Sequence, residues 1–224
     1  MTLNDSTITV FWAYFSDYTP TRFAPLLSTN EHTRAQRFIS DDVRDRFIIG
    51  RGLLRTALGQ HLNRAPESLV FDYGAQGKPI ISDAPLHFNL SHSADMLLLA
   101  LATHPLGADV EQIRPMTGQR TVAHDNFSPA EFAVWSALPA AEQSPAFFNI
   151  WTRKEAYIKA TGDGFRLPLA AFDVTHDQPA RFLRIDGDDL TRWRLHHLIL
   201  PGGYVGAVCC HHRAESIILS PLDV

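Results

Sequence analysis

The chain has 224 residues, which is enough for one large domain or two small ones whose core needs no covalent cross-links. Its formal net charge of −4 argues against general nucleic-acid or membrane binding, since proteins that bind those surfaces usually carry a basic excess. The first residues lack the basic segment of a secretory signal, and the adjacent Cys209 and Cys210 are expected to stay reduced. We therefore expect a cytoplasmic monomer that binds neither nucleic acid nor membrane.

The first half of the sequence predicts a strand, two helices and a small sheet. Apolar periodicity and capping residues give a strand over 7–15, a helix over 30–39 and a longer helix over 42–62, capped by Asp41 or Asp42. After a short strand near 69–72 and a glycine-rich turn, two strands joined at "SHSAD" follow.

The second half predicts similar elements, with helices beginning at Ser128 and near Phe147 and closing strands at 172–175, 193–199 and 204–210. This element order predicts an α+β fold with two lobes, each a small antiparallel sheet packed with helices. We place the N-terminal lobe at residues 1–103 and the C-terminal lobe at 104–224. No low-complexity linker separates them, which favours tight packing between the lobes.

Arginines are concentrated in the two helices predicted for the first half, in the segment "RAQRFISDDVRDRFIIGRGLLR". Such a segment is compatible with two solvated amphipathic faces. It is equally compatible with a local basic patch that binds one polyanionic ligand in an otherwise acidic protein.

Two acids follow the apolar run of the predicted central strands, in "LGADVEQIRP". Side chains alternate along a strand, so Asp109 and Glu111 point to the same side while Val110 points to the other. Two like charges at this separation repel each other. Either a surface turn leaves both solvated, or a cation lies between them.

A third acid lies on the predicted helix "WTRKEAYIKATGDGF". Trp151, Glu155 and Lys159 recur every four residues and share one helix face, with Lys154 beside them. An exposed Glu–Lys pair would explain the charges alone, but Trp151 on the same face is typical of a surface that closes over a cleft. If Glu155 joins Asp109 and Glu111, the three carboxylates form the oxygen ligand set that Mg²⁺ prefers.

These segments together resemble the Sfp-type 4′-phosphopantetheinyl transferases. The resemblance rests on "GADVE" followed by "WTRKEAYIK", with "GKP" and "FNLSHS" upstream and "FSPAE" between them, and it spans about residues 31–167. It implies two similar lobes related by a pseudo-twofold axis, with coenzyme A and Mg²⁺, or Mn²⁺, bound between them. The implied reaction transfers phosphopantetheine to a serine of an apo carrier protein of the acyl, peptidyl or polyketide type, releasing 3′,5′-ADP.

The resemblance also implies roles for individual residues. Asp109, Glu111 and Glu155 correspond to the metal ligands, and Lys159 to the lysine at the pyrophosphate. The residues implied to bind coenzyme A are Arg34, Arg46, Gly77, Lys78, Pro79, Ser91, His92, Lys154 and Lys159. One departure is Glu31, which stands where some relatives carry a basic residue for the 3′-phosphate.

The base that takes the serine proton stays open between two candidates. It is either Glu155 itself or a metal-bound water ordered by Glu131, and we prefer Glu155. Glu131 is nearly as well explained as an acid that stabilises a helix N-terminus.

Two other classes of function fit less well. A metal-dependent nuclease of the "D…(D/E)xK" kind needs a lysine two residues after the second acid, where this chain has Ile113. A non-catalytic module that only binds coenzyme A or a carrier protein would be expected to lose one of Asp109, Glu111, Glu155 or Lys159, and all four are present.

Overall fold

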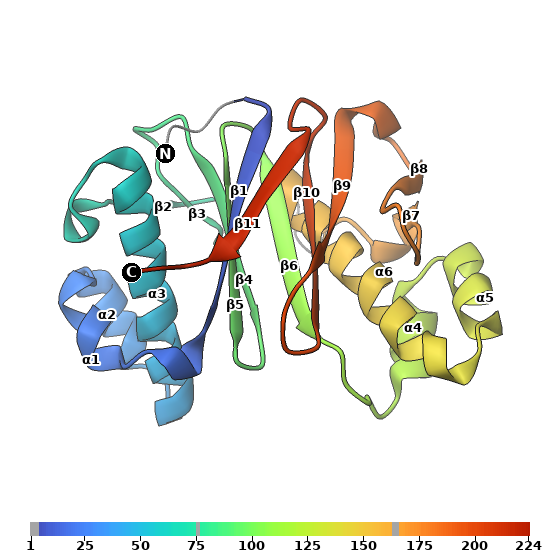
Figure 1. The fold of residues 1–224 in the computed structure, drawn as a ribbon, viewed down its shortest axis with the longest axis horizontal. Coiled ribbons are helices and arrows are strands. Elements are labelled where there is room, and N and C mark those ends of the chain that lie inside the picture. The colour runs from blue at the N-terminus through green and yellow to red at the C-terminus, as the bar shows by residue number, and fades with distance from the viewer. Residues whose placement is uncertain (1–4, 75–76, 163–165) are drawn as a thin grey trace.

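The computed structural model describes residues 5–74, 77–162 and 166–224, and it consists of two lobes with a sheet each (Figure 1). In the N-terminal lobe, the strands β1 (Thr7–Tyr14), β4 (His87–Ser93), β5 (Met96–Ala102) and β11 (Ser216–Pro221) form a sheet in the order β11-β1-β5-β4. The helices α1 (Pro20–Phe23), α2 (Thr29–Ala35) and α3 (Asp41–Leu62) cover its outer face. The short strands β2 (Asp72–Tyr73) and β3 (Pro79–Ile80) pair beside them.

The C-terminal lobe contains a sheet of β6 (Leu106–Gln112), β10 (Tyr204–His211) and β9 (Trp193–Ile199), in that order. The long helix α6 (Ala140–Thr161) packs on its outer face, next to α4 (Gln119–Asn126) and α5 (Pro129–Ala137). The strands β7 (Phe172–Val174) and β8 (Phe182–Ile185) form a separate pair. Among the described residues, no helix is both long and apolar enough to cross a bilayer.

The inner faces of the two sheets pack against each other (Figure 1). Alternate residues of β1, β5, β6 and β10 form one buried apolar cluster that includes Val10, Leu98, Val110 and Val208. Two further clusters lie on the outer faces, one under α3 and one around α6. This burial on both sides of each sheet explains why β5 is apolar at every position.

Polar side chains of β4 join the two sheets where β4 lies beside β6. Asn89 Oδ1 accepts a hydrogen bond from the Ala108 amide at 2.8 Å. Ser91 Oγ donates to Asp109 Oδ1 at 2.8 Å, and Ser93 Oγ donates to Glu111 Oε2. The alternation of side chains along both strands therefore brings the two acids of β6 to the boundary between the lobes.

The predicted α+β class with two lobes is confirmed, and two details of the prediction are corrected. The N-terminal sheet is not purely antiparallel, because β1 pairs in parallel with β11. Since β11 joins the N-terminal sheet, the last residues of the segment predicted as the C-terminal lobe pack with the other lobe. The division at residues 103 and 104 otherwise remains a prediction.

Candidate active site

A cleft of about 1050 Å³ opens between the lobes. One wall comes from α3 and the residues just before it, and the other from the end of α6 and from residues 167–170. The floor is formed by β4. Of the residues predicted to bind coenzyme A, those that line this cleft are Arg34, Arg46, Gly77, Lys78, Pro79, His92 and Lys159.

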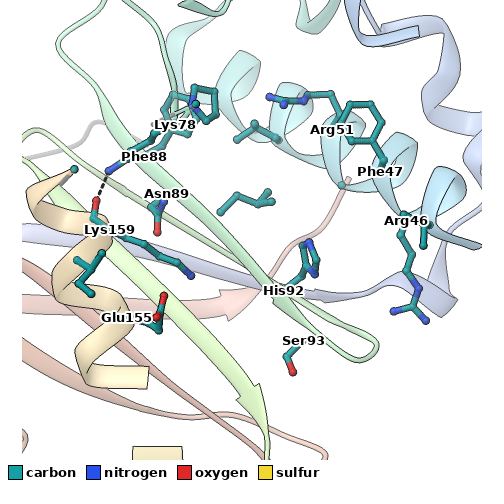
Figure 2. A pocket seen from close by; sticks show the side chains of 18 of the residues that line it. Arg46, Phe47, Arg51, Lys78, Phe88, Asn89, His92, Ser93, Glu155 and Lys159 are labelled. Carbon is teal, nitrogen blue, oxygen red and sulfur yellow. Dashed lines mark hydrogen bonds between the residues drawn. The ribbon is translucent and has the colours of Figure 1, made fainter. Parts of the chain in front are cut away.

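Glu155 and Lys159 lie on the same face of α6 and point toward β6, as the helical spacing predicts (Figure 2). The Lys159 ammonium donates to Asp109 Oδ1 at 2.5 Å and to Ser91 Oγ at 3.1 Å. Asp109 is 4% exposed, so this ion pair is largely shielded from water. The helical spacing predicted that Glu155 and Lys159 share a face, and the family resemblance implied that they meet Asp109. The contact between Lys159 and Asp109 is seen only in the structure.

The acids at this site are close enough to affect one another. Burial raises the pKa of Glu111, and the neighbouring Asp109 raises it further against the opposing hydrogen bond from Ser93. Burial also raises the pKa of Glu155, with Asp109 and Glu111 adding to the effect and Lys159 opposing it. A cation bound at this position would relieve the repulsion among the three carboxylates.

The donor set fits a hard divalent cation. In the described part of the chain, Asp109 Oδ2 is buried without a hydrogen-bond partner, and carboxylate oxygens are the ligands that Mg²⁺ prefers. No three acidic, histidine or cysteine side chains among the described residues already lie close enough to hold a metal ion. The side chains of Asp109, Glu111 and Glu155 would thus have to draw together around one.

Aromatic and basic side chains line the opposite wall. The guanidinium groups of Arg34 and Arg51 lie 5.3 and 5.7 Å from the centre of the Phe47 ring. Arg46 lies over the Phe15 ring and pairs with Asp42 at 3.0 Å. This wall offers positive charge together with flat apolar surface, which suits a nucleotide.

His92 lies between the basic wall and the acids. Its ring contacts Phe15 edge to face, with the ring centres 6.0 Å apart. Desolvation by the cleft walls lowers its pKa, and Lys159 and Arg46 lower it further. A neutral imidazole at neutral pH therefore donates one hydrogen bond and accepts another.

Glu31 is held by contacts within the N-terminal lobe. Its carboxylate is 3% exposed and accepts from the Ser28 amide, completing a capping box at the start of α2. It pairs with Arg51 at 3.2 Å and with Arg55 at 2.7 Å. Arg51 Nη1 is buried and has no hydrogen-bond partner among the described residues, which leaves this donor for a ligand at the cleft wall.

The structure gives Glu131 and Lys154 a different environment from the predicted one. Glu131 forms a capping box with Ser128 at the start of α5 and pairs with Lys154 at 2.7 Å. Lys154 is 0% exposed, and its remaining protons go to the carbonyl oxygens of Leu169 and Phe172. Neither residue belongs to the described lining of the cleft. The alternative reading of Glu131, a helix N-terminal acid, fits this geometry, and we assign neither residue a role at the ligand.

Sequence reasoning missed three residues of the site: Phe47, Arg51 and Ser93. Arg51 belongs to the basic segment, but the spacing of arginines on one helix does not show which of their side chains point into the cleft. Ser93 lies two residues after Ser91 on the same face of β4, so strand alternation alone could have found it.

Comparison with known proteins identifies the family. The model described as the 4′-phosphopantetheinyl transferase superfamily matches residues 105–209. The model described as 4′-phosphopantetheinyl transferase, N-terminal, matches residues 16–104. The chain is similar to the 4′-phosphopantetheinyl transferase HetI of Nostoc sp., 38% identical over 191 residues that cover 83% of this chain and 78% of HetI.

Two Bacillus subtilis proteins are also similar to the chain. One is a 4′-phosphopantetheinyl transferase with 33% identity, covering 68% of each chain. The other is the 4′-phosphopantetheinyl transferase Sfp, with 29% identity over 85% of each chain. With both lobes matched in order by family models, this chain belongs to the 4′-phosphopantetheinyl transferase superfamily.

Proposed function

We propose that the enzyme transfers the 4′-phosphopantetheine group of coenzyme A to a serine hydroxyl of an apo carrier protein. The observation that carries the proposal is the two-sided cleft. A basic and aromatic wall with Arg34, Phe47 and Arg51 faces an acidic group with Lys159 at its centre. The first wall suits the nucleotide half of coenzyme A, and the second suits a pyrophosphate whose charge changes during transfer.

In the proposed reaction the serine oxygen attacks the β-phosphorus, and the bond from that phosphorus to the bridging oxygen breaks. The released group is 3′,5′-ADP, and the serine proton passes to the Glu155 carboxylate. Glu155 is the candidate base because it lines the cleft one helical turn from Lys159. Lys159 faces the oxygen on which negative charge develops, and His92 holds a phosphate oxygen in place. The single hydroxyl proton of Ser91 is donated to Asp109, so Ser91 acts on that carboxylate instead of on the phosphate.

We propose Mg²⁺, with Mn²⁺ as a substitute, as the ion held by Asp109, Glu111 and Glu155. When bound it supplies positive charge next to the pyrophosphate oxygens. Ser93 and Ser91 orient the carboxylates of Glu111 and Asp109 through hydrogen bonds, so the protein holds two of the three ligands in fixed directions.

The direct test incubates the purified enzyme with coenzyme A, Mg²⁺ and a panel of apo acyl, peptidyl and polyketide carriers, and then weighs the carriers. We expect at least one carrier to gain the mass of phosphopantetheine, and excess EDTA to stop the gain. A complete panel without any mass change would overturn the assigned acceptor class.

A matched pair of variants tests whether Asp109 is a ligand of the metal ion. Asp109→Asn should abolish turnover while the unfolding temperature stays close to that of the parent, because the amide still accepts from Ser91. Asp125→Asn removes the same charge from the rim of the cleft, where Asp125 contacts His124, and should keep most of the activity. Full turnover by Asp109→Asn in excess EDTA would contradict the proposed metal site.

A further inference from the structure

All three lysines of the chain are held by internal contacts: Lys78, Lys154 and Lys159. Lys78 was predicted to lie beside the nucleotide. It lines the cleft, and its ammonium donates to the carbonyl oxygen of Leu106 at 2.9 Å and to that of Lys159 at 2.8 Å. Figure 2 shows the second of these bonds, which runs from the loop before β3 to the last turn of α6.

The two carbonyl groups belong to the elements that carry the acidic part of the site. Leu106 is the first residue of β6, which carries Asp109 and Glu111, and α6 carries Glu155 and Lys159. The bond from Lys78 is to the backbone of the residue whose side chain pairs with Asp109. A change in the position of Lys78 would therefore be transmitted directly to that ion pair.

The backbones of α6 and β6 are in unusually close contact at this point. A Cβ atom on Gly107 would lie 2.2 Å from the Ala156 carbonyl oxygen and 2.7 Å from the Lys159 carbonyl carbon. Because Gly107 allows this approach, one ammonium group can reach both carbonyls. Positive charge is also favourable here, since the C-terminal end of a helix carries partial negative charge.

We propose that Lys78 is a positioning residue for the transfer reaction: it ties α6 to β6 from the N-terminal lobe and so fixes the Lys159 ammonium against Asp109 and the pyrophosphate. This role differs from a contact with the nucleotide, because two of the three ammonium protons are already bonded to the protein. The inference rests on the proposed function for its effect on turnover, and on geometry alone for its effect on Lys159.

Kinetics of Lys78→Met separate positioning from ligand binding. Misplacing a catalytic group by about 1 Å can cost a hundredfold in rate, so we expect kcat to fall about ten- to a hundredfold. The dissociation constant for coenzyme A, measured by calorimetry without carrier, should change less than about threefold. Arg34→Met serves as the comparison, because a residue of the nucleotide wall should weaken coenzyme A instead. Weakened binding with an unchanged kcat in Lys78→Met would overturn the proposal.

A double variant tests whether the effect passes through Lys159. If Lys78 acts by positioning Lys159, then Lys78→Met should cost less than about threefold in kcat when Lys159 is already methionine. Independent roles would make the two losses multiply, and that result would contradict the proposal.

A readout that needs no turnover keeps this test separate from the test of function. Lysine labelled with ¹³C at Cε gives three side-chain signals, one from each lysine. The Cε of Lys78 lies next to an ammonium group whose pKa is lowered to about 8 by burial and by the nearby Lys159. In Lys78→Met the Lys159 signal should move, whereas that of the buried Lys154 should stay in place as an internal control. An unchanged Lys159 signal would overturn the proposal even if the wild-type enzyme transfers nothing.

Chemical rescue guards against a simple folding defect. Lys78→Cys can be alkylated with 2-bromoethylamine, which restores an ammonium group on a side chain of nearly the same length. Cys209 and Cys210 are 0% exposed, and burial raises the pKa of Cys210 to about 12, so neither native thiol should react in the folded protein. Alkylation should restore most of the lost kcat, and no recovery in a folded variant would contradict the proposed contact.

Discussion

At the scale of single residues, the two lobes hold a buried acid in the same way. Glu31 and Glu131 each complete a capping box at the start of a short helix, through Ser28 and Ser128. Each also pairs with a base on the following long helix, Arg55 in one lobe and Lys154 in the other. From the sequence, Glu131 was a candidate for the site, and Glu31 was a departure from the basic residue implied by the family resemblance. In the structure both stabilise the attachment of a short helix to a long one.

The pair in the C-terminal lobe gives a prediction about stability. Lys154→Met should lower the free energy of unfolding by about 3–5 kcal/mol, because it leaves the Glu131 carboxylate buried without its counter-ion. Adding Glu131→Gln should recover much of this loss, since the amide is uncharged and still accepts from the Val174 amide. Urea unfolding of the two variants measures both values, and a loss below about 1 kcal/mol in Lys154→Met would argue against a buried charged pair.

At the scale of elements, the site depends on the close contact between α6 and β6. Gly107 is the residue that permits it, through atoms of the helix backbone that cannot move independently. Glu155 and Lys159 are thereby held at a fixed distance from the acids of β6. A substitution that separates the two elements should therefore affect stability and turnover together.

Gly107→Ala tests this contact. Overpacking of this kind costs about 1–3 kcal/mol, so we expect a loss in that range in urea unfolding, together with a fall in kcat. Gly50→Ala on α3 is the matched control for stability. There the nearest atom to the added carbon is Leu97 Cδ1 at 3.4 Å, and alanine in a helix should gain about 0.5–1 kcal/mol. Equal stability of the two variants would show that α6 can shift without cost.

The sequence predicted those helices and strands whose own residues form a clear apolar pattern. The long helices were found from apolar periodicity. The strand β4 and the apolar run of β5 and β6 were found as two strands, whereas the structure divides the second of these into β5 and β6. The helix α4 was missed because its segment, "QRTVAHDN", has little apolar periodicity and follows a glycine. The strand β11 was missed because its partner, β1, lies at the other end of the chain, and pairing over such a separation leaves no local pattern.

In the candidate site, too, the sequence predicted what local geometry determines and missed what tertiary packing determines. Strand alternation placed Asp109 on one face of its strand, and helix spacing placed Glu155 and Lys159 on one face of their helix. The family resemblance implied that these two faces meet. Lys78 donates to backbone carbonyl groups, and Lys154 donates to two carbonyl groups and to the Glu131 carboxylate. The positions of all these partners depend on tertiary packing. Since a sequence shows the charge but not its partner, both lysines were assigned to the ligand.

At the scale of the whole molecule, the chain ends by returning to the lobe in which it began. Residues 216–221 of β11 pair in parallel with residues 7–12 of β1, which would otherwise form the edge of the sheet (Figure 1). Ile217 and Leu219 pack against the cluster between the sheets, and Leu222 is 3% exposed in the cluster under α3. The last strand therefore contributes to the packing that keeps the two walls of the cleft at a fixed separation.

Ending the chain after Glu215 should destabilise the N-terminal lobe first. Burial of one leucine contributes about 1.5–3 kcal/mol, so the loss of Leu222 together with the β11 ladder should lower the free energy of unfolding by more than about 2 kcal/mol. Hydrogen exchange should show faster exchange for residues 7–12, with much less change in residues 147–158 of α6. Ending the chain after Leu222 is the control, since it removes only Asp223 and Val224 and keeps the strand. If residues 7–12 and residues 147–158 lost protection to the same extent, the prediction would be wrong. In that case β11 would stabilise both lobes, and both walls of the cleft would depend on it.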